Sequence, residues 1–482
     1  MLWSLFQRFG TMGISFVSNI ILARLLTPED YGCIGMLMIF ILIANTFIDG
    51  GFGSALIQKK EPSQKDYSTI FYWNILISVI LYTVLYVCAP VIASFYDISL
   101  LSFVLRVQGI VLVINALSII QSTQLRKQLK FKKIASINIT SAVISVIIAI
   151  ILAYRGWGIW SLVAQQLLFS FFNALFLWIL NKWFPSLVFS RKSFSKLFGF
   201  GTYILFSNLF NTFCNNIQGV LIGKFFSPMI LGYYTQSRKL EEVASTSISN
   251  VMDQVSYPIF SEYQNDKVAL GNILKKFILS LAYFSIPLMT VLILIARPLI
   301  VLVYSAKWEP CVPYFQILCI AGIAVSLQGV NYYAVAAIGK SKELFIRTII
   351  IRTIGLIIVT FGLVIGGLWG LLVGVVVTSY ILYIANAYLV SKYIRYKLRH
   401  QFRDLSPILL LSALLYLIVW GITQWLDVNI YILGCVQLLL YAVLYASTSF
   451  LLFKLESALF FKDIIKSILR KHCPDFEMKL KK

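Results

Sequence analysis

Residues 22–32 read LARLLTPEDYG, and 200 positions later residues 222–232 read IGKFFSPMILG. A Thr-Pro or Ser-Pro pair and a closing glycine stand at the same places in both segments. Further landmarks repeat at offsets of 208 and 209, namely Pro90 with Pro298 and Gly158-Ile159-Trp160 with Gly367-Leu368-Trp369. The sequence therefore predicts an internal duplication in which both halves carry the same elements in the same order.

Composition identifies the class of protein that is duplicated. Of the 482 residues, 59% are hydrophobic and 12% are charged, and the net charge is +22. Soluble domains have about 25% charged residues, so a mean hydropathy of +0.85 excludes a soluble enzyme, a disordered chain and a disulfide scaffold. The seven cysteines form no CxxC motif, and we interpret them as small apolar residues rather than as metal ligands. We expect an all-α, polytopic membrane protein.

Apolar runs of helical length predict about fourteen transmembrane helices. Their ranges are 4–26, 32–57, 67–93, 100–123, 134–153, 159–181, 199–222, 230–261, 277–296, 313–337, 348–363, 368–390, 406–425 and 431–453. Lys and Arg alternate between the connections: one side holds 31 of them and the other side 4. Because positive charge resists translocation, both termini are predicted to be cytoplasmic. This distribution also explains the positive net charge. The basic residues set the topology and attract anionic lipid headgroups, so the charge does not indicate binding to nucleic acid.

The duplication divides the chain into lobes. Residues 1–198 and 199–396 are each predicted to form a six-helix lobe, 397–453 adds two helices, and 454–482 is a basic cytoplasmic tail. An even number of helices per half makes the repeats parallel. In transporters, such halves enclose a central site and rock against each other.

A polar stripe is also duplicated. Gln7, Thr11, Ser15 and Ser18 lie on one helix face, and Ser207, Asn211, Asn215 and Gln218 occupy the same positions shifted by 200. Such side chains must face protein or water rather than lipid. Two interpretations stay open: the stripe lines a shared cavity, or it supplies hydrogen bonds between helices.

Ten ionisable residues fall within the predicted spans: Arg8, Arg24, Asp49, Arg106, Arg238, Lys239, Glu241, Glu242, Asp253 and Arg352. The run from Arg238 to Glu242 lies near the middle of its helix, where a lipid-facing charge costs at least about 2.5–3.5 kcal/mol. It is expected to face a hydrated cavity, although Arg238 and Glu242 could instead form an internal i,i+4 ion pair. Asp49, Glu241, Glu242 and Asp253 are candidates for binding a coupled proton or sodium ion.

The segments LARLLTPEDYG (22–32), DGGFGSALIQ (49–58) and LGYY (231–234) with Arg238-Lys239-Leu240 resemble the Wzx/WzxC-type polysaccharide flippases. These belong to the multidrug/oligosaccharidyl-lipid/polysaccharide exporter superfamily. The resemblance implies a multi-pass protein of the bacterial inner membrane that moves a polyprenyl-diphosphate-linked oligosaccharide outward by alternating access. It also allows a partnership with polysaccharide polymerase machinery, and it implies no cofactor.

The resemblance further implies that cations bind the diphosphate and that the polar stripe binds the sugars. Arginine forks and lysine charges suit phosphate oxygens. The matching residues here are Arg8, Arg24, Arg106, Arg238, Lys239 and Arg352 for the diphosphate, and Thr11, Ser15, Asn211, Asn215 and Gln218 for the sugars.

Two other functions remain as alternatives. One is a cation-coupled small-molecule or drug antiporter of the same superfamily, and the other is a membrane oligosaccharide polymerase or ligase. The second is weaker because the predicted outer loops are short, no HExxH motif occurs, and His400 and His472 are both predicted to be cytoplasmic. The absence of a GxxxxGK[ST] motif predicts that the chain carries no ATPase motor. We therefore expect no catalytic residues.

Overall fold

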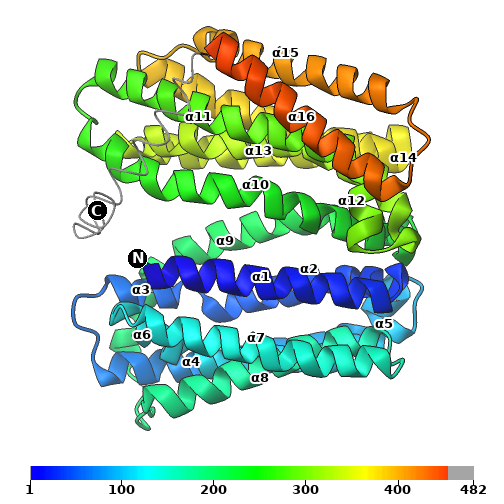
Figure 1. Ribbon diagram of the computed structural model, residues 1–482. Helices are drawn as coiled ribbons and strands as arrows, with labels where there is room; N and C mark the ends of the chain where they lie inside the picture. Colours follow the sequence, from blue (N-terminus) through cyan, green and yellow to red (C-terminus); the bar gives the residue numbers. More distant parts are fainter. Residues whose placement is uncertain (1, 454–482) are drawn as a thin grey trace, which may run out of the picture. The chain divides into compact units, whose positions relative to one another are not determined.

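The computed structural model describes the secondary structure of residues 2–453. Side chains are described for residues 10–449, except 196, 200, 203, 248, 250, 251, 253 and 254. Within this part of the chain the structure is helical and contains no strand (Figure 1). The helices are α1 (Leu2–Leu25), α2 (Pro28–Asp49), α3 (Phe52–Gln58), α4 (Gln64–Phe95), α5 (Leu100–Gln108), α6 (Ile110–Lys127), α7 (Phe131–Tyr154), α8 (Ile159–Asn181), α9 (Arg191–Phe225), α10 (Pro228–Glu262), α11 (Lys267–Leu294), α12 (Ala296–Val303), the 3-10 helix η1 (Ala306–Cys311), α13 (Val312–Ala337), α14 (Ser341–Tyr393), α15 (Leu398–Thr423) and α16 (Ile430–Phe453).

Many of these helices can cross a membrane. Among the described residues, ten helical segments are long and apolar enough to do so by length and composition. The polar helices α9 and α10 fall outside that set, and the described part of α1 forms a shorter apolar helix, Gly10–Leu25. The predicted all-α, polytopic fold is confirmed, while fourteen crossings and cytoplasmic termini stay predictions.

The long helix α14 contains two of the predicted spans, 348–363 and 368–390. It is interrupted at Gly367, where φ is 57° and ψ is −138°. A Cβ atom at Gly362 would lie 2.3 Å from the carbonyl oxygen of Gly370, so the two arms fold back on each other. Gly158 adopts nearly the same backbone conformation, with φ 52° and ψ −129°, before α8. The backbone therefore supports the predicted match between Gly158 and Gly367.

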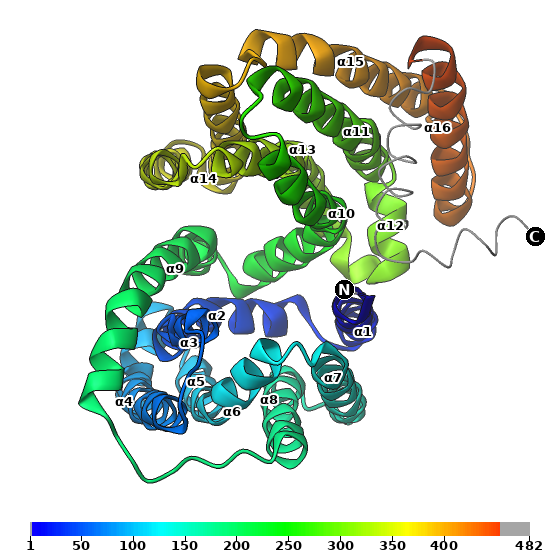
Figure 2. The ribbon, with the colours of Figure 1, turned by 90° about the vertical axis from the view of Figure 1, so that its left-hand side faces the viewer.

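The helices group into two compact units, Met1–Thr235 and the residues from Gln236 onward. In the first unit, α7 packs against α1 and α8, α6 packs against α4 and α8, and α9 packs against α2 (Figure 2). In the second unit, α13 packs against α14 and α11, and α15 packs against α11 and α16. The units divide later than residue 198 because α9 packs against α2, α3 and α4. The lobe boundaries that follow from the duplication stay a prediction.

Within the first unit, the two copies of the repeated motif touch each other. Thr27 caps α2 and forms a capping box with Asp30. A Cβ atom added at Gly32 would lie 1.8 Å from the carbonyl oxygen of Pro228, and one added at Gly232 would lie 1.9 Å from that of Pro28. We call this contact the paired motif. Its two glycines are required because a side chain on either would collide with backbone.

The predicted span 32–57 is interrupted in the structure. Gly50 and Gly51 both have left-handed backbone conformations, with φ of 54° and 71°, and they separate α2 from the short helix α3. Glycine favours this region because it has no Cβ. The predicted span 100–123 is likewise two helices, α5 and α6, which meet at Gly109. The break after α2 places the end of that helix beside a polar pocket.

Candidate functional site

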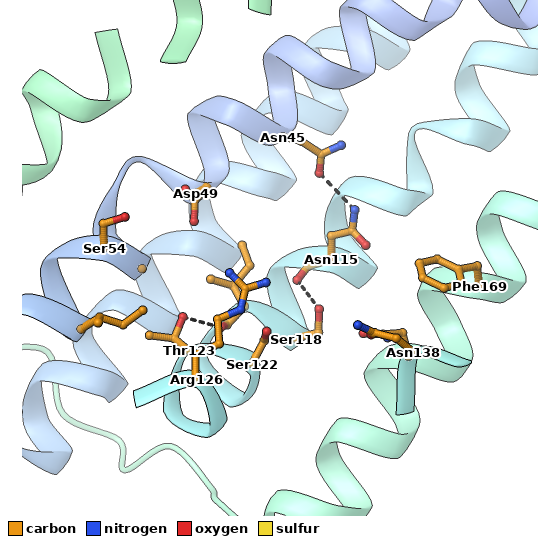
Figure 3. A pocket seen from close by; sticks show the side chains of 14 residues that line it. Asn45, Asp49, Ser54, Asn115, Ser118, Ser122, Thr123, Arg126, Asn138 and Phe169 are labelled. Carbon is orange, nitrogen blue, oxygen red and sulfur yellow. Dashed lines mark hydrogen bonds between the residues drawn. The ribbon is translucent and has the colours of Figure 1, made fainter. Parts of the chain in front are cut away.

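A pocket of about 500 Å³ lies inside the first unit, between α2, α3, α6, α7 and α8 (Figure 3). Its lining is mostly amide and hydroxyl side chains, with one carboxylate, one guanidinium and one aromatic ring. The lining residues are Asn45, Asp49, Gly53, Ser54, Ile57, Asn115, Ser118, Ile119, Ser122, Thr123, Arg126, Asn138, Phe169 and Asn173. Binding pockets of this volume hold small molecules or parts of larger ones.

Hydrogen bonds between neighbouring helices hold the amides in place. Asn115 on α6 donates from Nδ2 to Asn45 Oδ1 on α2 over 3.1 Å. Asn173 on α8 donates from Nδ2 to Asn138 Oδ1 on α7 over 2.7 Å. Each of these amides keeps further donor or acceptor capacity, because an Asn side chain has two N–H groups and two lone pairs. The pocket wall is therefore ordered and can still bind hydroxyl groups.

Two opposite charges point into the pocket (Figure 3). Asp49 is the last residue of α2, and the backbone amide of Gly51 lies near its carboxylate. Arg126 lies in the last turn of α6, close enough for its charge to attract Asp49. Together they offer an acceptor for sugar hydroxyls and a bidentate donor for anionic oxygens.

The short helix α3 is fixed against this wall by α6. Lys127 donates from Nζ to the carbonyl oxygens of Leu56 and Ile57, over 3.2 and 2.9 Å, and also to that of Lys59. A cation near the last carbonyls of a helix is favourable because it satisfies acceptors that lack a helical partner. Gly53 leaves just enough room for its neighbours, since a Cβ there would lie 3.3 Å from Asp49 Oδ1.

Sequence reasoning found Asp49 and missed the rest of the pocket. A signal existed on α6, where Asn115, Ser118, Ser122 and Arg126 follow each other at spacings of three or four residues. The predicted span ends at residue 123 and so places Arg126 in a cytoplasmic connection, whereas α6 continues to Lys127.

The duplicated polar stripe has mixed surroundings in the first unit. Ser18 is buried and accepts a hydrogen bond over 2.8 Å from Gln165 on α8, as expected for hydrogen bonding between helices. Ser15 and Asn215 are exposed, while Thr11, Asn211 and Gln218 are half-buried. The side chain of Gln7 lies outside the described residues. None of these residues lines the pocket, and their binding role stays a prediction.

The predicted cations are dispersed over both units. Arg24 is exposed at the end of α1. Arg106 is half-buried. Its Nε atom donates to the carbonyl oxygen of Tyr86 over 3.3 Å, and its Cζ atom lies 4.5 Å from the centroid of the Tyr86 ring. Arg352 is half-buried on the first arm of α14. The side chains of Arg8 and Asp253 lie outside the described residues.

The charged run of α10 belongs to the second unit. Arg238 donates from Nε to Glu242 Oε1 over 3.0 Å, so the expected i,i+4 ion pair is present. Lys239 is exposed, whereas Glu241 is buried, with 7% of its surface accessible. The run therefore contains a partly exposed ion pair and one buried carboxyl group. Among the described residues, no cluster of three or more His, Cys, Asp or Glu could hold a metal ion.

Residues 21–313 match the model of a family described as polysaccharide biosynthesis protein. The teichuronic acid biosynthesis protein TuaB of Bacillus subtilis is 30% identical over 338 residues, which cover 69% of each chain. The lipopolysaccharide biosynthesis protein WzxC of Escherichia coli is 21% identical over 334 residues, which cover 67% of this chain and 66% of WzxC. These matches confirm the resemblance predicted from the sequence.

Solved transporter structures share the fold. The lipid II flippase MurJ matches with a TM-score of 0.76 at 17% identity, covering 96% of this chain and 99% of MurJ. A multidrug resistance MATE transporter matches with a TM-score of 0.61 at 15% identity, covering 83% of this chain and 95% of that one. The chain therefore shares the fold of these two proteins. The chain therefore belongs to the family of polysaccharide biosynthesis proteins and is a multi-pass protein of the bacterial inner membrane.

Proposed function

We propose that this protein is a flippase that moves a polyprenyl-diphosphate-linked oligosaccharide from the cytoplasmic to the outer leaflet of the inner membrane. The observation that carries the proposal is the match of residues 21–313 to a polysaccharide family on a chain with a transporter fold. A membrane-embedded transporter in polysaccharide synthesis has a lipid-linked glycan as its natural cargo. The chain then acts as a carrier and not as an enzyme.

The pocket around Asp49 and Arg126 supports this function. Sugars present many hydroxyl groups, and the pocket offers amides, hydroxyls and a charged pair of both signs. Phe169 adds a ring against which the apolar face of a sugar can pack. We propose that one part of the glycan binds here during transport.

The diphosphate needs cations, and the exposed or partly exposed positive side chains Arg238 and Lys239 are the proposed partners. Arg238 already pairs with Glu242, so a diphosphate would compete for its guanidinium. Arg24, Arg106 and Arg352 are proposed as further contacts along the path, with Thr11, Ser15, Asn211, Asn215 and Gln218 as contacts for sugar hydroxyls.

The test is the leaflet location of lipid-linked glycan in vesicles with and without the purified protein. With the protein, glycan should become accessible to an enzyme that modifies only the opposite leaflet. Accessibility equal to that of empty vesicles would refute the proposal.

In cells, Arg238→Ala and Lys239→Ala should leave lipid-linked glycan on the cytoplasmic leaflet at normal protein level. Arg155→Ala, on the exposed connection before α8, is the matched control and should transport normally. Normal surface polysaccharide in both α10 variants would remove these two residues from the site.

A further inference from the structure

The connection between α8 and α9 presents large apolar side chains to its surroundings. It comprises residues 182–190, KWFPSLVFS, contains neither helix nor strand, and runs past α4 (Figure 2). Leu187 is 94% exposed and Phe184 is 68% exposed, and Val188 and Phe189 are exposed as well. We call this segment the strap. Contact of so much apolar surface with water is unfavourable, so the strap is expected to meet lipid or a partner.

Hydrogen bonds to the first turns of α4 fix the strap in this arrangement. Gln64 donates from Nε2 to the carbonyl oxygen of Phe184 over 2.7 Å. The backbone N–H of Ser186 donates to Ser68 Oγ over 2.9 Å, and Ser68 is fully buried. Trp183 is half-buried and donates from Nε1 to Gln64 Oε1 over 2.6 Å. The strap is therefore an integral part of the first unit, and its outward side chains do not belong to a detached loop.

The corresponding connection of the second repeat buries its apolar side chains. At the repeat offset of 209, Leu187 corresponds to Tyr396. Tyr396 is 4% exposed and donates to Asp404 Oδ2 over 2.9 Å, and Ile394 in the same connection is buried as well. The exposure of the strap is therefore particular to the first repeat and does not follow from its place in the duplicated fold.

The boundary between lipid headgroups and acyl chains suits the strap. Both α4 and α8 are candidate membrane spans, and the strap lies where α4 begins, α8 ends and α9 begins. Irregular backbone does not occur in contact with the hydrocarbon core, because lipid cannot satisfy its polar groups. At the boundary, the backbone keeps water and headgroups as partners, while aromatic and aliphatic side chains reach the acyl chains. A membrane surface can therefore cover the exposed side chains and still satisfy the polar backbone.

Exposed cations flank the strap. They are Lys65 on α4, Lys182 at the start of the strap, and Arg191 and Lys192 in the first turn of α9. Asp66, the acidic residue in the first turn of α4, is buried and pairs with Lys59. Cations at the beginning of a helix are unfavourable because that end carries a partial positive charge, and an anionic surface offsets this cost. The charge around the strap therefore complements a surface of net negative charge.

We propose that the strap is an interfacial anchor that binds phospholipids of net negative charge. The side chains of Phe184 and Leu187 enter the region of the acyl chains, and the flanking cations bind headgroup phosphates. Arginine offers a bidentate fork to phosphate oxygens, and lysine offers a point charge. With the predicted topology, these lipids belong to the cytoplasmic leaflet. The anchor is independent of the proposed flippase function, because it needs only the membrane.

Photo-crosslinking in vesicles identifies what covers the strap. Benzoylphenylalanine replaces Phe184 in the full-length protein, which is reconstituted in equal parts of phosphatidylglycerol and phosphatidylethanolamine, and mass spectrometry identifies the adducts. The matched control is the same replacement at Phe361 of α14, a 64% exposed ring with no Lys or Arg within eight residues in the sequence. Phosphatidylglycerol should be enriched at Phe184 by about fivefold or more relative to Phe361, which is the factor expected for one basic residue near an anionic surface.

Two results would overturn the anchor. One is the same ratio of the two lipids at Phe184 and Phe361. The other is a Phe184 adduct that consists of protein in place of lipid, whether from residues 454–482 or from a second copy of the chain.

Substitutions test the cations. Arg191→Gln combined with Lys192→Gln should lower the enrichment at Phe184 by about fivefold or more, while lipid adducts persist because the apolar side chains still reach the acyl chains. Lys342→Gln, which replaces an exposed lysine at the start of α14, is the control and should leave the enrichment unchanged. Full enrichment in the double variant would refute the role of these cations. Flipping is measured in neither experiment, so both results stand whether or not the chain is a flippase.

Discussion

The paired motif allows the sharpest test of the packing, through the substitution Gly32→Ala. The new Cβ atom would lie 1.8 Å from the carbonyl oxygen of Pro228, whereas real Cβ atoms essentially never come within 3.0 Å of such an atom. The first turns of α2 and α10 must therefore move apart by about 1.2 Å. Overpacking of this kind costs about 1–3 kcal/mol, and the higher helix propensity of alanine offsets up to about 1 kcal/mol.

Thermal unfolding of the purified protein, followed by intrinsic fluorescence, measures this cost. At about 2–4 °C per kcal/mol for a unit of this size, the overpacking in Gly32→Ala should lower Tm by about 2–12 °C, of which the gain in helix propensity restores at most about 4 °C. Gly232→Ala should lower it by a similar amount, because its Cβ would lie 1.9 Å from the carbonyl oxygen of Pro28. The double variant should lose less than the sum, since one displacement relieves both collisions.

The control is Gly13→Ala on α1, where an added Cβ atom meets no heavy atom within 4 Å. Its Tm should stay the same or rise slightly, because alanine favours helix over glycine. If Gly32→Ala unfolds at the same temperature as this control, the close approach of the two motifs is wrong.

Two further predictions concern the helix reversals and the pocket. Gly158→Ala and Gly367→Ala should each cost about 1–3 kcal/mol of unfolding free energy because both positions have positive φ, whereas Gly366→Ala, with no atom near its Cβ, should cost far less in the same thermal assay. Arg126→Ala and Asp49→Asn should each slow flipping in vesicles by about tenfold or more at normal protein level. The reason is that a hydrogen bond to a charged group is worth about 1.5–3 kcal/mol. Unchanged rates in both variants would show that the pocket does not take part in transport.

Hydropathy predicts where most helices lie because it depends on local sequence. The duplication adds that corresponding elements recur in the same order in the second half. The predicted spans 348–363 and 368–390 correspond to the two arms of α14, although the helix between them is interrupted only at Gly367. Positive φ at Gly50 and Gly51 was not predicted, because hydropathy averages over a window and cannot locate a break of two residues. The repeat predicts that Gly158 and Gly367 correspond, and the two residues have nearly the same backbone angles in the structure.

The candidate site was harder to predict because it depends on which faces of different helices meet. The sequence predicts Asp49 as an isolated charge in a span and places Arg126 in a cytoplasmic connection, whereas both residues line the pocket and Arg126 belongs to α6. The amides Asn115 and Asn173 are ordinary in sequence and become informative only when α2, α6, α7 and α8 are assembled. Likewise, the difference in burial between Glu241 and Glu242 depends on Gly322 of α13, far away in the sequence, where a Cβ atom would lie 2.3 Å from Glu241 Oε1.

The reciprocity of the paired motif also implies a local symmetry. Gly32 lies against Pro228 while Gly232 lies against Pro28, which is the self-complementary pattern that two copies of one chain make across a two-fold axis. Two copies of a half-sized chain with one such segment would make the same contact as a symmetric dimer. The first copy has Glu29 and Asp30 where the second has Met229 and Ile230. Within this one polypeptide the residues beside the two glycines differ, whereas the contact requires glycine at both positions.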